Sequence, residues 1–202
     1  MCRHGATATL PAGRNDGILP MAIDLYQPFT NPITRETFRC ISSTEEAFTM
    51  EWTVHPGGYV PFEHVHINQD EIFHVQRGEM RVLVKGMEQY GKIGDVLTIP
   101  RGTRHIAFND KDEPLVCIVE YKPGLDHYKT MQCFAGLTLD CDYDRRGLVN
   151  IAKIMFMLKT CNALSLTRPA FAPDWVFRLG MNTFYAMGSI LKWETLYKKY
   201  TE

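Results

Sequence analysis

The chain has 202 residues, of which 45% are hydrophobic and 22% are charged, and its formal net charge is -1. This length allows one sizeable domain with a buried core, and the balanced charge argues against a nucleic-acid partner. The six cysteines are scattered without a C-x-x-C pair, and the chain starts without the apolar stretch of a signal peptide. We therefore expect reduced thiols and a cytoplasmic location.

The first segment, residues 1–36, is rich in Gly, Pro, Thr and Asn and has no helical periodicity. Such a composition predicts an N-terminal arm that lies along a domain. It contains no recognisable helix-turn-helix, so no DNA-binding module is expected there.

Residues 37–141 are predicted to form a β-barrel domain. Up to Tyr121, short runs rich in β-branched and aromatic residues alternate with turn residues, as in "AFTMEWTVHP", "EMRVLVKG" and "LVCIVEY". This spacing is typical of a β-sandwich or barrel. The stretches "VQRGEM" and "VKGMEQ" indicate tight hairpins.

Residues 142–202 are predicted to form a helical extension, because the hydrophobic period changes there from two to three and four. The first of two expected helices lies in "DRRGLVNIAKIMFMLKT", with Asp144 as its N-cap and Lys159 in its last turn. The second begins at Pro173 and carries a broad apolar face.

These helices are not expected to cross a membrane. The longest uncharged run in the second one, residues 179–191, is well short of the roughly 20 residues that a span needs. Residues 141–202 hold nine Lys and Arg against five Asp and Glu, a net charge of +4 that would allow contact with an anionic membrane surface. The preferred interpretation is that the helices cover the barrel or a dimer partner.

The stretch "HVHINQDEIFHVQRG", from His64 to Gly78, crowds histidines and acids into a segment that otherwise reads as strand. Residues two apart in a strand face the same side, so His64 and His66 point together, and Glu71 can reach the same space from the next strand. Imidazole and carboxylate ligands suit a divalent transition metal such as Fe, Mn, Ni, Cu or Zn. The sequence therefore predicts a metal site with positions left open for substrate or water.

This stretch also resembles the first of two motifs that identify the cupin superfamily of small jelly-roll barrels. The pattern G-x5-H-x-H-x(3,4)-E-x6-G is matched from Gly58 to Gly78. The second pattern, G-x5-P-x-G-x2-H-x3-N, is matched from Gly94 to Asn109, after fifteen intervening residues. The resemblance implies a mainly β fold, a double-stranded β-helix (jelly-roll) barrel, to which this chain would add its two C-terminal α-helices.

The resemblance also implies a complete set of metal ligands. In metal-binding cupins the histidines and the glutamate of the first motif converge inside the barrel with the histidine of the second. Carried over to this sequence, the implied ligands are His64, His66, Glu71 and His105. A barrel that binds a small molecule without a metal remains an alternative, because some cupins have lost these ligands.

Other residues are expected around the site. By alternation or proximity, the apolar wall would consist of Phe62, Phe73, Val75, Ile99 and Phe108, with Tyr59, Gln69 and Arg104 as polar groups at the rim. His74 should face away from the ligands, and His55 lies near the barrel mouth. No role is assigned to His4 or His127.

A mostly apolar cup suits a hydrophobic small molecule better than a sugar phosphate. The preferred hypothesis is a metal-dependent enzyme, most simply a dioxygenase-type oxidoreductase, in which no catalytic residue beyond the ligands is identified. Metal-dependent isomerase or lyase chemistry is an alternative, and so is a non-enzymatic cupin that binds or senses a small molecule. A homodimer is expected because cupins commonly pair sheets or swap edge strands.

Overall fold

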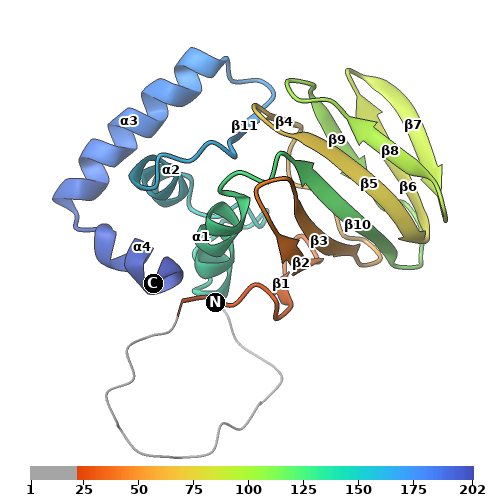
Figure 1. Cartoon of the computed structure of the whole chain (residues 1–202), viewed down its shortest axis with the longest axis horizontal. Helices are drawn as coiled ribbons and strands as arrows, with labels where there is room; N and C mark the ends of the chain where they lie inside the picture. The colour runs from red at the N-terminus through yellow and green to blue at the C-terminus, as the bar shows by residue number, and fades with distance from the viewer. Residues whose placement is uncertain (1–21) are drawn as a thin grey trace, which may run out of the picture.

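The structure is a computed structural model and describes residues 22–202. Two antiparallel sheets face each other, and the helices pack together at one side of them (Figure 1). The strands are β1 (Phe29–Asn31), β2 (Glu36–Ser43), β3 (Phe48–Val54), β4 (His64–His66), β5 (Asp70–Arg77), β6 (Glu79–Val84), β7 (Met87–Lys92), β8 (Val96–Ile99), β9 (His105–Phe108), β10 (Leu115–Lys122) and β11 (Thr167–Pro169). The helices are α1 (His127–Leu139), α2 (Ile151–Thr160), α3 (Asp174–Ile190) and α4 (Glu194–Thr201).

The sheets have the strand orders β1-β2-β3-β10-β5-β8 and β11-β4-β9-β6-β7. Strand β3, and strand β10 as far as Tyr121, alternate between buried and half-buried side chains, because one face of each points into the barrel. Fully enclosed residues such as Met80, Val82 and Leu115 form the core between the sheets. The predicted double-stranded β-helix is therefore confirmed.

Only one of the two predicted hairpins is present. Strands β6 and β7 pair through a turn in which Lys85 and Gly86 both have positive φ, as a two-residue turn of type I′ requires. The prediction for "VQRGEM" is wrong, because β5 and β6 belong to different sheets. Gly78 turns the chain from one sheet to the other at φ 77°, where a Cβ would lie 2.9 Å from the carbonyl oxygen of Pro114.

The helical region contains more and shorter helices than predicted. Helix α2 begins at Ile151, with Asn150 as its N-cap accepting a hydrogen bond from the backbone N–H of Lys153. Asp144, the predicted N-cap, instead accepts backbone hydrogen bonds inside a turn that contains Gly147 at φ 78°. A helix cannot run through this left-handed residue without interruption, so it starts later.

The second predicted helix is divided in two. It begins at Asp174, directly after Pro173 as expected, but it ends at Ile190, and Lys192 at φ 58° separates it from α4. Helix α1 was not predicted, because its sequence "HYKTMQCFAGLTL" lacks a clear apolar stripe. The expectation of two C-terminal helices is therefore corrected to four helices in the described part of the chain, three of which follow residue 142.

The helical region is joined to the barrel by backbone pairing. Strand β11 lies antiparallel to β4, with Thr167 opposite His66 and Pro169 opposite His64. At the start of α1, the carboxylate of Asp126 accepts hydrogen bonds from the backbone N–H groups of the segment that leads into β11. The division into arm, barrel and extension stays a prediction, and the part of the arm that holds Cys2 and His4 lies outside the described residues.

Close packing of α1 against α4 supports a stability prediction. A Cβ at Gly136 would lie 2.3 Å from the ring of Tyr200, which is 1% exposed. Alanine is better in a helix than glycine by about 1 kcal/mol, but overpacking costs about 1–3 kcal/mol. We expect Gly136→Ala to lower the free energy of unfolding, measured by chemical denaturation.

The matched control is Gly180→Ala in α3, where the nearest atom to a new Cβ is Met155 Sδ at 3.5 Å. This ordinary contact leaves only the helix-propensity gain, so Gly180→Ala should be neutral or stabilising. Equal stabilisation by both substitutions would contradict the packing described for α1 and α4.

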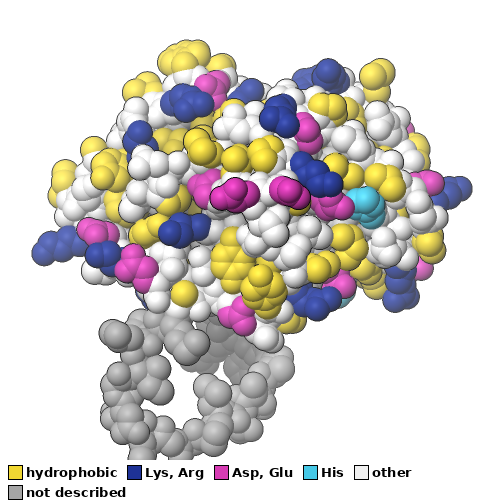
Figure 2. All heavy atoms as spheres, in the orientation of Figure 1, with side chains coloured by type: hydrophobic (Ala, Val, Ile, Leu, Met, Phe, Trp, Pro, Cys, Tyr) yellow, Lys and Arg dark blue, Asp and Glu magenta, His cyan; other side chains and the backbone are white. Residues whose placement is uncertain are grey.

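The outer face of α3 exposes several large apolar side chains. Trp175, Leu179 and Ile190 are 69%, 57% and 81% exposed. Figure 2 shows hydrophobic side chains among charged ones over this part of the molecule. None of the helices within residues 22–202 is long and apolar enough to cross a membrane.

Candidate metal centre and adjoining cavity

Four side chains from three strands converge inside the barrel. His64 and His66 lie on β4, Glu71 lies on β5 and His105 lies on β9. One nitrogen or oxygen atom from each lies within 4.8 Å of the corresponding atoms of the other three. Glu71 Oε2 is 2.6 Å from His105 Nε2 and 3.2 Å from His66 Nε2. The structure therefore brings together all four residues named from the sequence.

Hydrogen bonds on the outer side of the cluster fix the imidazole rings of His64 and His105. His64 Nδ1 lies 3.2 Å from the carbonyl oxygen of Phe62, and His105 Nδ1 lies 3.0 Å from that of Thr103. A carbonyl oxygen only accepts, so each Nδ1 donates its proton there. Metal binding requires an unprotonated Nε2 on each ring, and at His105 the ion would replace the hydrogen bond that Nε2 donates to Glu71 Oε2.

His66 is oriented by the helical region. Its Nδ1 lies 2.9 Å from Thr167 Oγ1 on β11, the strand that pairs with β4. Its Nε2 is buried and finds no hydrogen-bond partner of normal geometry among residues 22–202. A buried ring nitrogen without a hydrogen-bond partner is costly unless something binds to it, so this atom fits a metal ligand.

The electrostatics of the cluster favour a negative Glu71. Burial would raise the pKa of Glu71, but the imidazoles of His66 and His105 outweigh that effect and hold its pKa well below the usual range. Burial, together with the other two imidazoles, lowers the pKa of His64 to about 3, so this ring is neutral. Tyr121 donates a hydrogen bond of 2.7 Å to Glu71 Oε1, which leaves Oε2 directed at the histidines.

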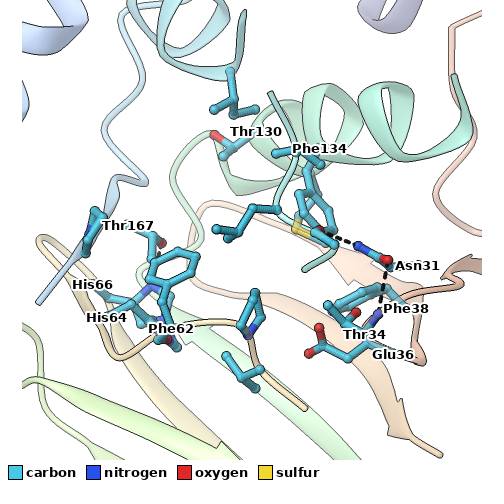
Figure 3. Close-up of a pocket in the computed structure, with 18 of the residues that line it drawn as sticks. Asn31, Thr34, Glu36, Phe38, Phe62, His64, His66, Thr130, Phe134 and Thr167 are labelled. Carbon is cyan, nitrogen blue, oxygen red and sulfur yellow. Dashed lines mark hydrogen bonds between the residues drawn. The ribbon is translucent and has the colours of Figure 1, made fainter. Parts of the chain in front are cut away.

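The cluster lies in the wall of a cavity of about 430 Å³ between the barrel and the helices. Most of the lining is apolar and comes from both parts of the chain. It includes Phe38, Met50, Trp52, Phe62, Phe73 and Val119 of the barrel, and Met131, Phe134, Ile154, Met155 and Leu158 of the helices. Figure 3 shows Phe62 beside His64 and His66, with Phe134 reaching in from α1.

His127, to which the sequence assigned no role, lines this cavity. Its ring stacks on Tyr121 at a centroid distance of 4.0 Å, and its Nδ1 lies 3.0 Å from Gln69 Oε1. The Gln69 amide nitrogen donates to the carbonyls of Pro123 and Gly124, so Gln69 Oε1 is the acceptor and His127 Nδ1 carries the proton. Burial lowers the pKa of His127 to about 3, and its Nε2 therefore accepts hydrogen bonds as a neutral ring.

The predicted cavity wall is partly correct. Phe62 and Phe73 line the cavity, whereas Val75 and Ile99 are buried in the core away from it. Phe108 faces outward, with the guanidinium of Arg81 4.1 Å from its ring centroid. The prediction fails there because alternation was counted one residue out of register.

The predicted rim residues also lie elsewhere. Gln69 is 1% exposed and holds His127. Arg104 is exposed, with its nearest acid, Glu63, at 3.7 Å, and the hydroxyl of Tyr59 donates to the carbonyl of Arg146. None of these three is among the described residues that line the cavity.

The remaining histidines of the barrel point away from the cluster. His74 faces away as predicted, and its Nε2 lies 3.0 Å from Glu120 Oε1 on the outside of the sheet. His55 Nε2 lies 3.1 Å from Thr37 Oγ1, and His55 is likewise absent from the described lining of the cavity.

Comparison with known proteins identifies the family. Residues 50–121 match a family described as the Cupin domain. The chain is 32% identical over 160 residues to a protein named oxidoreductase iacF from Pestalotiopsis fici, and the match covers 75% of this chain and 76% of that protein. The chain belongs to the cupin superfamily.

Solved structures are similar to about half of this chain. A protein with a double-stranded β-helix domain from Klebsiella pneumoniae is 24% identical and covers 48% of this chain and 78% of its own, with a TM-score of 0.40. An RmlC-like cupin from Methanocaldococcus jannaschii is 16% identical and covers 48% of this chain and 87% of its own, with a TM-score of 0.41.

Sequence reasoning missed four residues of the site: Glu36, Tyr121, Thr167 and His127. Tyr121 follows Cys117 and Val119 on the inward row of β10, so strict alternation could have found it. Glu36 alternates with Phe38 on β2 in the same way, but it was placed in the arm. No local signal marks Thr167 or His127, because only tertiary packing brings them to the cavity.

Proposed function

We propose that this cupin is a metal-dependent oxidoreductase that acts on a small, mostly apolar organic molecule, in a reaction of dioxygenase type. The observation that carries the proposal is the convergence of three imidazoles and one carboxylate within 4.8 Å in the wall of a largely apolar cavity. The similarity to a protein named an oxidoreductase supports the reaction class.

The donor set fits a divalent transition metal. His64, His66, Glu71 and His105 would hold the ion, and three nitrogens with one oxygen suit Fe, Mn, Ni, Cu or Zn. Such an ion, when bound, supplies Lewis acidity and, if it is redox-active, electron transfer with O₂.

The residues of the chain have separate roles in this proposal. Tyr121 holds Glu71 in position through their hydrogen bond. His127 would orient a substrate hydroxyl by accepting a hydrogen bond from it. An imidazole with a pKa of about 3 is too weak a base to remove the proton itself. The aromatic and aliphatic walls would bind the apolar part of the substrate and exclude water from the cluster.

The test is metal analysis of untagged protein, followed by an oxygen-electrode screen with hydroxylated aromatic and alkyl compounds after loading with each candidate metal. We expect near-stoichiometric metal, and O₂ consumption that depends on both a redox-active ion and a substrate. Zinc-loaded protein is the control and should consume no O₂. Failure to bind any of the metals, or binding of all of them without O₂ consumption, would contradict the proposal.

Other features inferred from the sequence stay predictions. They are the homodimer, the cytoplasmic location, the absence of a nucleic-acid partner and contact of the helices with a membrane surface. The exposed apolar side chains of α3 are compatible with the homodimer. Analytical ultracentrifugation of the full chain would test this state directly.

A further inference from the structure

A second polar group lies in the cavity away from the metal cluster. Glu36, on the inward face of β2, is 5% exposed and lines the cavity. Figure 3 shows Glu36 and Thr34 on the opposite side of the pocket from His64 and His66, with the Glu36 carboxylate pointing into the space between them. The metal cluster makes no use of this carboxylate.

One oxygen of Glu36 is fixed and the other is available. The indole N–H of Trp52 donates to Glu36 Oε1 at 3.1 Å. Among the described residues no hydrogen bond is made to Oε2, and no Lys, Arg or His forms an ion pair with Glu36. Arg146, which lines the same cavity, pairs with Asp144 instead.

The neighbouring Thr34 hydroxyl faces the same carboxylate. Thr34 is fully buried, its Oγ1 makes no hydrogen bond of normal geometry within residues 22–202, and its hydroxyl opposes the rise in the pKa of Glu36. Asn31, the third polar residue here, differs because its amide donates to the carbonyl of Gly147 and its oxygen accepts from the backbone of residues 33 and 34. The unmet hydrogen-bonding capacity therefore belongs to Glu36 and Thr34.

A carboxylate that lines an apolar cavity is destabilising unless donors reach its oxygens, so the retention of Glu36 in this wall favours a ligand that supplies a donor. We propose that Glu36 is a specificity-determining residue that binds a hydroxyl group at the end of the substrate remote from the metal cluster. The inference rests on the proposed function in one respect, that the other end of the substrate binds at the metal cluster.

The ligand class follows from the rest of the wall. Between the metal cluster and Glu36 the cavity is lined by apolar groups. Among them are Phe38 and Phe134, whose rings pack edge to face with their centroids 5.6 Å apart. The substrate would therefore be an elongated, mostly apolar molecule with an oxygen donor at one end and a hydroxyl at the other. An ammonium group is a poorer fit, because burying it in this wall would cost more desolvation than burying a neutral hydroxyl.

The experiment uses alkyl hydroxamic acids of graded chain length, whose hydroxamate chelates transition metals. Each probe ends in a hydroxyl, a methyl group or a methyl ketone, and binding to metal-loaded protein is measured by calorimetry at about pH 8.5. At one chain length, wild type should bind the hydroxyl probe about tenfold more tightly than the methyl probe, as one hydrogen bond to a charged acceptor predicts. The ketone probe should bind no better than the methyl probe.

Two variants separate recognition from a structural role. In Glu36→Leu the hydroxyl and methyl probes should bind with about equal affinity. In Glu36→Gln the amide oxygen would stay on Trp52 and the amide nitrogen would face the cavity, so the ketone probe should gain about tenfold over its wild-type affinity. A carboxylate that only supports Trp52 would produce neither change.

The same titrations on the metal-site double variant His64→Ala/His66→Ala distinguish this inference from the proposed function. Absolute affinity should fall there, while the hydroxyl-to-methyl ratio should persist because Glu36 does not contact the cluster. A wild type that binds no metal but keeps the ratio would refute the proposed metal site and leave this inference standing. Metal-loaded wild type that prefers the hydroxyl probe at no chain length, or binds none of the probes, would overturn the inference.

Discussion

The double variant His64→Ala/His66→Ala should contain almost no metal, whereas wild-type protein should contain close to one ion per chain. Both side chains contribute a nitrogen to the cluster around Glu71, and two ligands out of four cannot hold a divalent ion against solvent. Loss of a single outer-shell partner of a metal ligand typically costs about 10–100-fold in affinity, so the loss of two direct ligands should exceed about a hundredfold. Elemental analysis of the two purified proteins measures this directly.

The control for this variant is His74→Ala. His74 lies on the same strand as Glu71 but on the outer side, where it contacts Glu120. Its removal should leave both metal content and O₂ consumption unchanged. Equal metal content in the double variant and wild type would show that the ion binds elsewhere, and equal loss in His74→Ala would indicate a general effect on folding.

Replacing Glu36 with glutamine should change how stability depends on pH. Burial raises the pKa of Glu36 from its ordinary value of 4.5 to about 7, although the Thr34 hydroxyl and the Trp52 indole oppose this rise. Between these two pH values the folded protein retains a proton that the unfolded chain has released. The stabilising contribution of Glu36 is therefore complete below about pH 4.5 and is lost as the pH rises through 7.

The size of this loss follows from the two pKa values. At about 1.4 kcal/mol per unit, the wild type should lose about 3 kcal/mol relative to Glu36→Gln between acid and mildly alkaline pH. Tyr121, whose own pKa is raised well above the usual range by burial and by Glu71, stays neutral throughout and does not contribute. Arg146, the nearest cation in the lining, pairs with Asp144 and not with Glu36.

Urea denaturation of both proteins from about pH 5 to 8.5 tests this prediction. Because the metal-ligand cluster is the same in both proteins, its titration cancels in the difference. Parallel stability profiles would contradict a raised pKa at Glu36. If Glu36→Gln is more stable than wild type above about pH 7 and also changes the preference among the probes, then Glu36 lowers the stability of the folded protein and contributes to substrate recognition.

The sequence alone determined the barrel and the four-residue cluster. Period-two alternation identified β3 and β10 of one sheet and β6 of the other, because one face of each strand is buried. Strand spacing predicted His64, His66 and Glu71 on one side, because local backbone geometry is sufficient to direct such side chains inward. The resemblance to the cupin motifs added His105, which lies on a strand distant in the sequence.

The tertiary structure decided what surrounds the cluster. Thr167 reaches His66 only because β11 pairs with β4 across about a hundred residues of chain, and His127 enters the cavity on a helix without a clear apolar stripe. Glu36 faces the cluster from the far wall because β2 lies in the other sheet from β4. Alternation along β2 can place Glu36 inward, but the group that it faces, like the positions of Thr167 and His127, depends on non-local pairing and on the packing of helices against the barrel.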